Sequence, residues 1–155
     1  MSAPTRHHEQ APAEQSMSRR EELAVSGSVL SEAPWALAGA AGVVTAGGDF
    51  VLHLMALHLA ISSPLAMGTV AFFAVAGAGS LLRSRPSRAL QWAQRNPWRF
   101  AAFPGLACAI VVFVLSMIDS GGIAGSVFTG LWHGAAAYGL TGLVGSVGRP
   151  RRARA

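Results

Sequence analysis

The chain has 155 residues, of which 52% are hydrophobic and only 12% are charged. Soluble globular domains carry about a quarter charged residues. Together with a mean hydropathy of +0.42, this composition excludes an ordinary soluble domain and indicates a membrane protein with a single domain. The formal net charge is +5. We do not expect nucleic-acid binding, because no folded basic domain is left outside the apolar stretches.

The basic residues are confined to three segments. All twelve are arginines, and they lie in residues 1–33, 83–99 and 149–155. The apolar stretches 34–82 and 100–148 between them contain neither arginine nor lysine, and each is long enough for two bilayer spans. By the positive-inside rule, the arginine segments lie in the cytoplasm. The sequence therefore predicts an all-α, integral membrane four-helix bundle of two helical hairpins, with both termini cytoplasmic.

The predicted spans follow from apolar runs and turn residues. Turns are indicated by Ser62-Ser63-Pro64 and by Asp119-Ser120-Gly121-Gly122. The predicted spans cover residues 35–61, 64–82, 100–118 and 123–147. The first would be about 40 Å long, so we expect it to tilt, or to kink at Gly47-Gly48. The third is the most uniformly apolar, and we expect it to face lipid most.

The N-terminal segment differs from the predicted spans in composition. Residues 1–33 are rich in serine, alanine, proline and glutamate, which predicts a mostly disordered cytoplasmic tail. Ser18 and Glu21 have the spacing of a capping box, which favours a short helix over residues 19–25. The use of arginine to the exclusion of lysine, with abundant alanine and glycine, suggests a bacterial source, and we expect the plasma (inner) membrane.

The connector 83–99 combines arginines with tryptophans and prolines. We expect a short helix over residues 87–95 in the plane of the lipid headgroups, and Asn96-Pro97 as the start of the third span. The tail 149–155 is also basic. The residues expected to face anionic lipid or a partner are Arg83, Arg85, Arg88, Trp92, Arg95, Trp98, Arg99, Arg149, Arg151, Arg152 and Arg154.

Polar residues inside the spans are the candidates for chemistry. Thr45, Asp49 and His53 are spaced by four residues and share one face of the first span, and Thr129 and His133 do the same on the fourth. Ionisable groups are costly inside a bilayer, so each needs a partner. Both histidines lie about 12–15 Å from the same end of their spans. If these spans are antiparallel neighbours, the two imidazoles can meet.

Three interpretations of this polar cluster stay open. In the first interpretation, the cluster is a structural clamp, with hydrogen bonds that contribute about 0.6 kcal/mol each. Alternatively, Asp49 and a histidine handle protons or ions within the membrane. As a third interpretation, His53 and His133 ligate a haem. We expect no cofactor, no metal site and no catalytic residue, because the single Cys108 excludes a CxxC site and no nucleophile motif is present.

Small residues at spacing four indicate close helix packing, either within one chain or between two chains. They are Ala38, Gly42 and Ala46 in the first span and Ser126, Gly130 and Gly134 in the fourth.

The function predicted from the sequence is therefore that of a small, non-enzymatic membrane protein. It would act as an accessory or scaffolding component in envelope, secretion or plasmid-transfer machinery, through anionic lipid and through another membrane protein or a second copy of itself. The alternatives are a small transporter or oligomeric pore that uses the polar cluster, and a haem-binding membrane subunit. A pore would need a continuous polar stripe, which the second and third spans lack.

Overall fold

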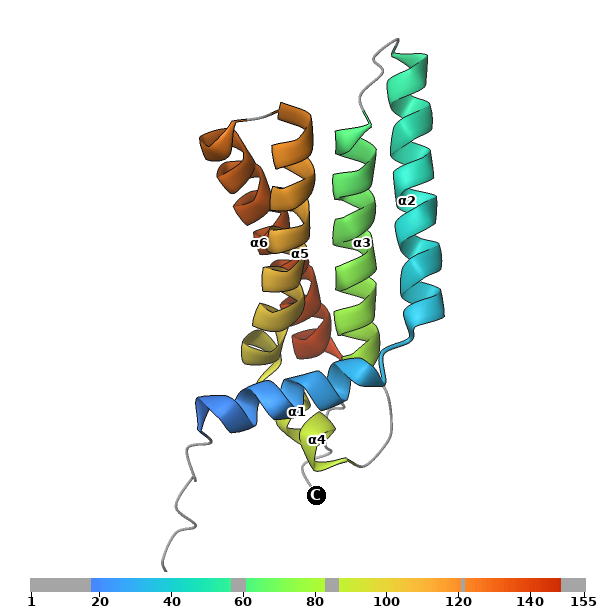
Figure 1. The fold of residues 1–155 in the computed structure, drawn as a ribbon. Helices are drawn as coiled ribbons and strands as arrows, with labels where there is room; N and C mark the ends of the chain where they lie inside the picture. Colours follow the sequence, from blue (N-terminus) through green and yellow to red (C-terminus); the bar gives the residue numbers. More distant parts are fainter. Residues whose placement is uncertain (1–17, 57–60, 83–86, 121, 149–155) are drawn as a thin grey trace, which may run out of the picture.

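The computed structural model describes residues 18–56, 61–82, 87–120 and 122–148. Every element in these ranges is an α-helix, so the all-α prediction is confirmed. The helices are α1 (Arg19–Ser31), α2 (Trp35–Met55), α3 (Ser62–Leu81), α4 (Arg88–Arg95), α5 (Pro97–Ser120) and α6 (Ile123–Val147). Figure 1 shows α2, α3, α5 and α6 running side by side, while α1 and α4 lie across one end of this bundle.

Three of the helices are long and apolar enough to cross a membrane, as expected of an integral membrane protein. They are α2, α3 and residues Pro97–Asp119 of α5. Helix α6 has 25 residues and covers the range predicted for the fourth span, but it is not one of the three. The apolar residues of α6 are interrupted by glycines and by less apolar residues such as Ser126, Trp132 and His133.

Helix α3 is the centre of the bundle. It packs against α2 on one side and against both α5 and α6 on the other, and α5 and α6 pack against each other. Of the most apolar 18-residue stretch of each helix, 50% of the residues are buried in α3, 28% in α5 and 11% in α2. The expectation that the third span faces lipid most is therefore wrong: α2, which packs mainly on α3, is the most exposed.

The ends of the first hairpin differ from the prediction. Helix α2 ends at Met55, not at residue 61, so its 21 residues span about 32 Å and fit a bilayer without a kink. The next helix begins at Ser62, two residues before the predicted start. The remaining residues of the predicted first span, 57–60, lie outside the described residues.

The segment predicted as a disordered tail contains helix α1. Its start is the capping box: Glu21 N–H donates to Ser18 Oγ at 3.3 Å, and Ser18 N–H donates to Glu21 Oε2 at 2.7 Å. The helix continues to Ser31, six residues beyond the predicted 19–25. It extends because Ser26 and Val29 are buried against the rest of the protein. Disorder is thus wrong for α1, and residues 1–17 lie outside the described part of the chain.

Helices α1 and α4 form a layer over the end of the bundle where α3 and α6 end and α5 begins, which we call the arginine end. Its core is a buried cluster: Val29, Leu81, Leu90, Ala93 and Phe100. Gln94 also donates through Nε2 to the carbonyl of Leu81 at 2.9 Å, and Arg99 Nη1 bonds Glu22 Oε1 at 3.1 Å. The opposite end of the bundle, where α3 and α6 begin, we call the far end.

Close backbone contacts hold each hairpin together. A Cβ on Gly68 of α3 would lie 2.8 Å from the carbonyl oxygen of Gly42 on α2. A Cβ on Gly134 of α6 would lie 2.6 Å from Ala109 Cβ and 2.8 Å from Gly105 O on α5. Only glycine allows the backbones to come this close.

The other small residues lie along the same two contacts. Ala38 is fully buried, and Ala46 contacts α3. Gly130 faces Ala109 and Phe113 of α5, and Ser126 is buried and donates through Oγ to the carbonyl of Gly122 at 2.9 Å. These residues join helices within one chain, which is one of the two alternatives left open by the sequence.

Candidate functional site

The polar residues of α2 face α3. Asp49 Oδ2 accepts a hydrogen bond from Ser63 Oγ at 3.2 Å and lies 3.3 Å from His53 Nδ1. The side chains of Asp49 and His53 are 21% and 32% exposed. Thr45 is half-buried on the same helix. Because Gly42 fits against α3, Thr45 and Asp49, three and seven positions further along the helix, are turned toward α3 as well.

The polar residues of α6 lie on the other side of α3. His133 Nδ1 bonds the carbonyl of Thr129 at 2.8 Å, and both side chains are half-buried. Further along the same face, the methyl group of Thr141 packs where Gly77 of α3 has no side chain. The predicted cluster is therefore divided into two groups, because α3 lies between α2 and α6. The first and fourth predicted spans are therefore not neighbours, and His53 and His133 do not meet.

The two imidazole rings make the same hydrogen bond, and this bond determines which ring nitrogen donates and which can accept. His53 Nδ1 lies 2.9 Å from the carbonyl of Asp49, as His133 Nδ1 does from that of Thr129. A carbonyl oxygen can only accept, so Nδ1 carries the hydrogen in each ring. In the neutral ring, Nε2 is then a free hydrogen-bond acceptor.

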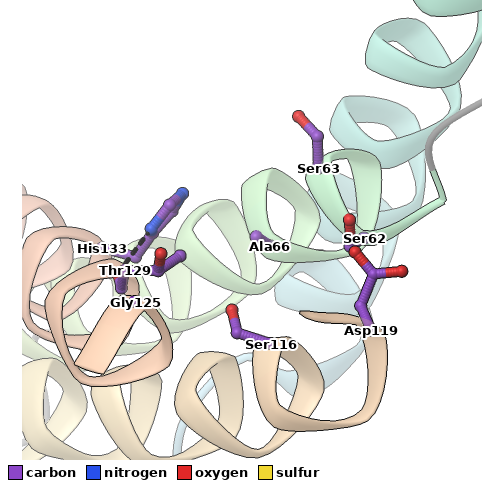
Figure 2. A pocket seen from close by; sticks show the side chains of 8 residues that line it. All are labelled: Ser62, Ser63, Ala66, Ser116, Asp119, Gly125, Thr129 and His133. Carbon is purple, nitrogen blue, oxygen red and sulfur yellow. Dashed lines mark hydrogen bonds between the residues drawn. The ribbon is translucent and has the colours of Figure 1, made fainter. Parts of the chain in front are cut away.

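A polar cavity of about 350 Å³ lies at the far end, between α3, α5 and α6. Its lining combines the starts of α3 and α6 with the end of α5: Ser62, Ser63, Ala66, Ser116, Asp119, Gly125, Thr129 and His133. In Figure 2, Asp119 and Ser62 lie at one side of the cavity, His133 and Thr129 at the other, and Ser116 between them. We call this the far-end cavity.

Ser63 connects the two polar groups. Its hydroxyl donates to Asp49 on α2, and the same residue lines the far-end cavity that contains His133. The carboxylates, hydroxyls and imidazoles of these groups can hold one another in fixed orientations and can accept protons from a bound molecule. Bis-histidine haem ligation by His53 and His133 is not supported, because their helices do not pack together. Within the ranges that the structure describes, no three histidine, cysteine or acidic side chains are grouped to hold a metal.

The arginine end is the second candidate surface. Arg88 and Arg95 are exposed on α4, and the side chain of Arg99 is 69% exposed. Trp92 was expected to face anionic lipid or a partner, but it packs partly buried against the cluster under α1 and α4. Trp98 is 43% exposed and lies 5.5 Å from the ring of Tyr138, centroid to centroid. Six further arginines expected here lie outside the described residues: Arg83, Arg85, Arg149, Arg151, Arg152 and Arg154.

Sequence reasoning missed the serines and the role of Asp119. Asp119 and Ser63 were predicted only as turn residues. The structure brings Ser62, Ser116 and Asp119 into one cavity. A signal for this exists in the sequence: every one of these residues lies within one turn of the same end of its predicted span, and so at a similar depth.

Comparisons with known protein families, with curated proteins and with solved structures give no match.

Proposed function

We propose that this chain is a four-span protein of a bacterial plasma membrane, with α6 as the fourth span and both termini in the cytoplasm. Helix α6 is 25 residues long, about 37 Å, and packs along α5. The described arginines all lie at one end of the bundle, which the positive-inside rule assigns to the cytoplasm.

At this arginine end, we infer a non-enzymatic accessory role through anionic lipid and a partner protein. The observation that carries this proposal is the layer formed by α1 and α4. The apolar side of this layer is buried in the cluster around Phe100. The outward side of the layer is polar and bears Arg88 and Arg95. Such a surface attracts anionic headgroups, at about 1 kcal/mol per arginine.

Neutralising Arg88 and Arg95 is expected to weaken the preference for anionic lipid. At about 1 kcal/mol per charge, each substitution lowers the preference roughly fivefold. We would compare wild type with the double variant R88Q/R95Q, by counting the phosphatidylglycerol and phosphatidylcholine molecules retained in native mass spectra. Gln91→Ala on the exposed side of α4 is the matched control, because it changes no charge. Equal lipid preferences in wild type and R88Q/R95Q would contradict lipid binding by this surface.

A protein partner is tested at the same surface. A photo-crosslinking amino acid at Gln91 should yield a defined adduct in cells, whereas the same probe at Val43, 74% exposed on α2, should not. The adduct should disappear in the R88Q/R95Q background. An adduct of equal yield from both positions would show that the arginine end has no specific partner.

A second candidate function is proton or ion movement, and the contacts of Asp49 favour it. A carboxylate in a predicted span that accepts a hydrogen bond from Ser63 and lies 3.3 Å from His53 Nδ1 is the kind of group found in proton relays. Ser63 also belongs to the lining of the far-end cavity, and its hydroxyl points away from the cavity toward Asp49 (Figure 2).

The Asp49→Asn variant separates this role from a structural clamp. Asparagine keeps an acceptor for Ser63 but cannot ionise, so proton-coupled flux into proteoliposomes is expected to fall by about 100-fold or more, the range for loss of a proton-transfer group. The stability of the bundle should change by about 1 kcal/mol or less. Unchanged flux in D49N would remove this candidate and leave the clamp.

A further inference from the structure

The described lining of the far-end cavity carries one formal charge and several hydrogen-bond acceptors. Asp119 supplies the negative charge. The apolar stretches from which the cavity is built contain no arginine or lysine to neutralise it. The hydroxyls of Ser62, Ser116 and Thr129 can all accept, as can His133 Nε2, because His133 Nδ1 is committed to the Thr129 carbonyl.

We propose that the far-end cavity is a binding site for a small protonated primary amine. An ammonium group carries three N–H donors, which match the Asp119 carboxylate and the Ser62 hydroxyl on the same side of the cavity (Figure 2). Thr129 and His133, on the other side, can bind a polar group at the opposite end of the same small molecule. The volume of about 350 Å³ is at the lower end of the range for ligand pockets, so the ligand is small.

Two other classes of cation fit less well. Calcium and magnesium require about six oxygen ligands, usually with several carboxylates. The described lining of the cavity has one carboxylate, that of Asp119. Quaternary ammonium compounds are held by aromatic rings. Among the residues that the structure describes, no phenylalanine, tyrosine or tryptophan lines this cavity. The hydrogen-bonding lining selects for a cation that can donate.

The helix ends limit the affinity. Helices α3 and α6 begin at Ser62 and Ile123 without a side-chain hydrogen bond to cap them. Their free N–H groups place partial positive charge at the far end, which opposes a cation. We therefore expect binding in the millimolar range rather than tighter.

The amine has two sources, a free metabolite and the headgroup of phosphatidylethanolamine. In the proposed membrane arrangement, the far end lies at headgroup depth, so a lipid can reach the cavity from the side. Binding of a free amine does not depend on that arrangement, which keeps the two proposals separable.

The test uses the full-length protein in nanodiscs of phosphatidylcholine, with ethanolamine as the probe and calorimetry as the measurement. Wild type should bind ethanolamine saturably at millimolar concentration. Asp119→Asn should weaken binding about tenfold or more, and Thr129→Val severalfold, because a charged and a neutral hydrogen-bond partner are lost. Glu22→Gln makes the same change of charge at the arginine end and should bind like wild type. Circular dichroism should show the same helicity in all variants.

The control ligand is tetramethylammonium, which has the same charge and no N–H donor and should not bind saturably. Replacing a third of the nanodisc lipid by phosphatidylethanolamine should lower the apparent affinity for ethanolamine if the headgroup is an occupant. An unchanged affinity would assign the site to free amines. Ethanolamine binding that is equal in wild type and D119N would overturn the proposal. So would equal binding of tetramethylammonium, or the absence of any binding in phosphatidylcholine nanodiscs.

Discussion

Replacing Gly134 by leucine is expected to separate α6 from α5. A Cβ at this position would lie 2.6 Å from Ala109 Cβ and 2.8 Å from the carbonyl oxygen of Gly105, so the backbone, and not merely a flexible side chain, obstructs it. Overpacking of this kind costs about 3 kcal/mol or more when the backbone must move. We expect G134L to lower the free energy of unfolding by at least this amount, measured by titrating detergent-solubilised protein with sodium dodecyl sulfate.

The matched control for G134L lies on the same helix. A Cβ at Gly139 would meet nothing within 4 Å, so Gly139→Leu should leave stability unchanged or raise it through helix propensity. If the two variants unfold at the same detergent fraction, then α5 and α6 do not pack through Gly134.

Phe100→Ala is expected to release the layer of α1 and α4. Phe100 is fully buried in the cluster that holds this layer to the bundle. Its truncation leaves a cavity and should cost about 3–5 kcal/mol. Because α1 is attached mainly through this cluster, trypsin should cut much faster after Arg19 and Arg20, and mass spectrometry of the fragments would show this.

The control for F100A is Phe128→Ala on α6, whose side chain is 72% exposed. It removes the same group from the surface, and tryptic cleavage in α1 should stay at the wild-type rate. Cleavage in α1 that F100A does not accelerate would mean that the layer is held by other contacts.

Local rules predicted the short elements well. Ser87 accepts the N–H of Leu90 at 3.1 Å, so α4 starts where serine favours an N-cap. Helix α5 begins at Pro97, as the Asn96-Pro97 pair indicates. Such features depend on a few neighbouring residues, and a sequence contains all the information needed to predict them.

Helix pairing could not be predicted in the same way. The spans are apolar on every side, so hydrophobic periodicity does not say which face is covered. The order of α2, α3, α5 and α6 depends instead on where backbones can approach closely. The glycines at 42, 68 and 77 place α3 between the two polar stripes. Small residues were singled out only in the first and fourth spans, so the packing role of Gly68 and Gly77 in α3 was not predicted.

The candidate site was predicted only in part for the same reason. Thr129 and His133 were singled out by their cost in a membrane and do line the far-end cavity, but Asp49 and His53 lie on the opposite side of α3. The extent of α1 was missed because Ser26 and Val29 are buried only by contacts with distant segments. Burial of that kind is a tertiary effect, which local composition does not reveal.

The central claim is a bundle that crosses the membrane four times with its arginine end inside the cell. Labelling by a membrane-impermeant maleimide tests it most directly, in a Cys108→Ala background with single cysteines introduced as Gly122→Cys, Ser87→Cys and Gly148→Cys. Intact cells should be labelled at position 122 only, and positions 87 and 148 should react only after the membrane is opened. Labelling of position 148 from outside would show that α6 does not cross, and labelling of position 87 from outside would reverse the proposed orientation.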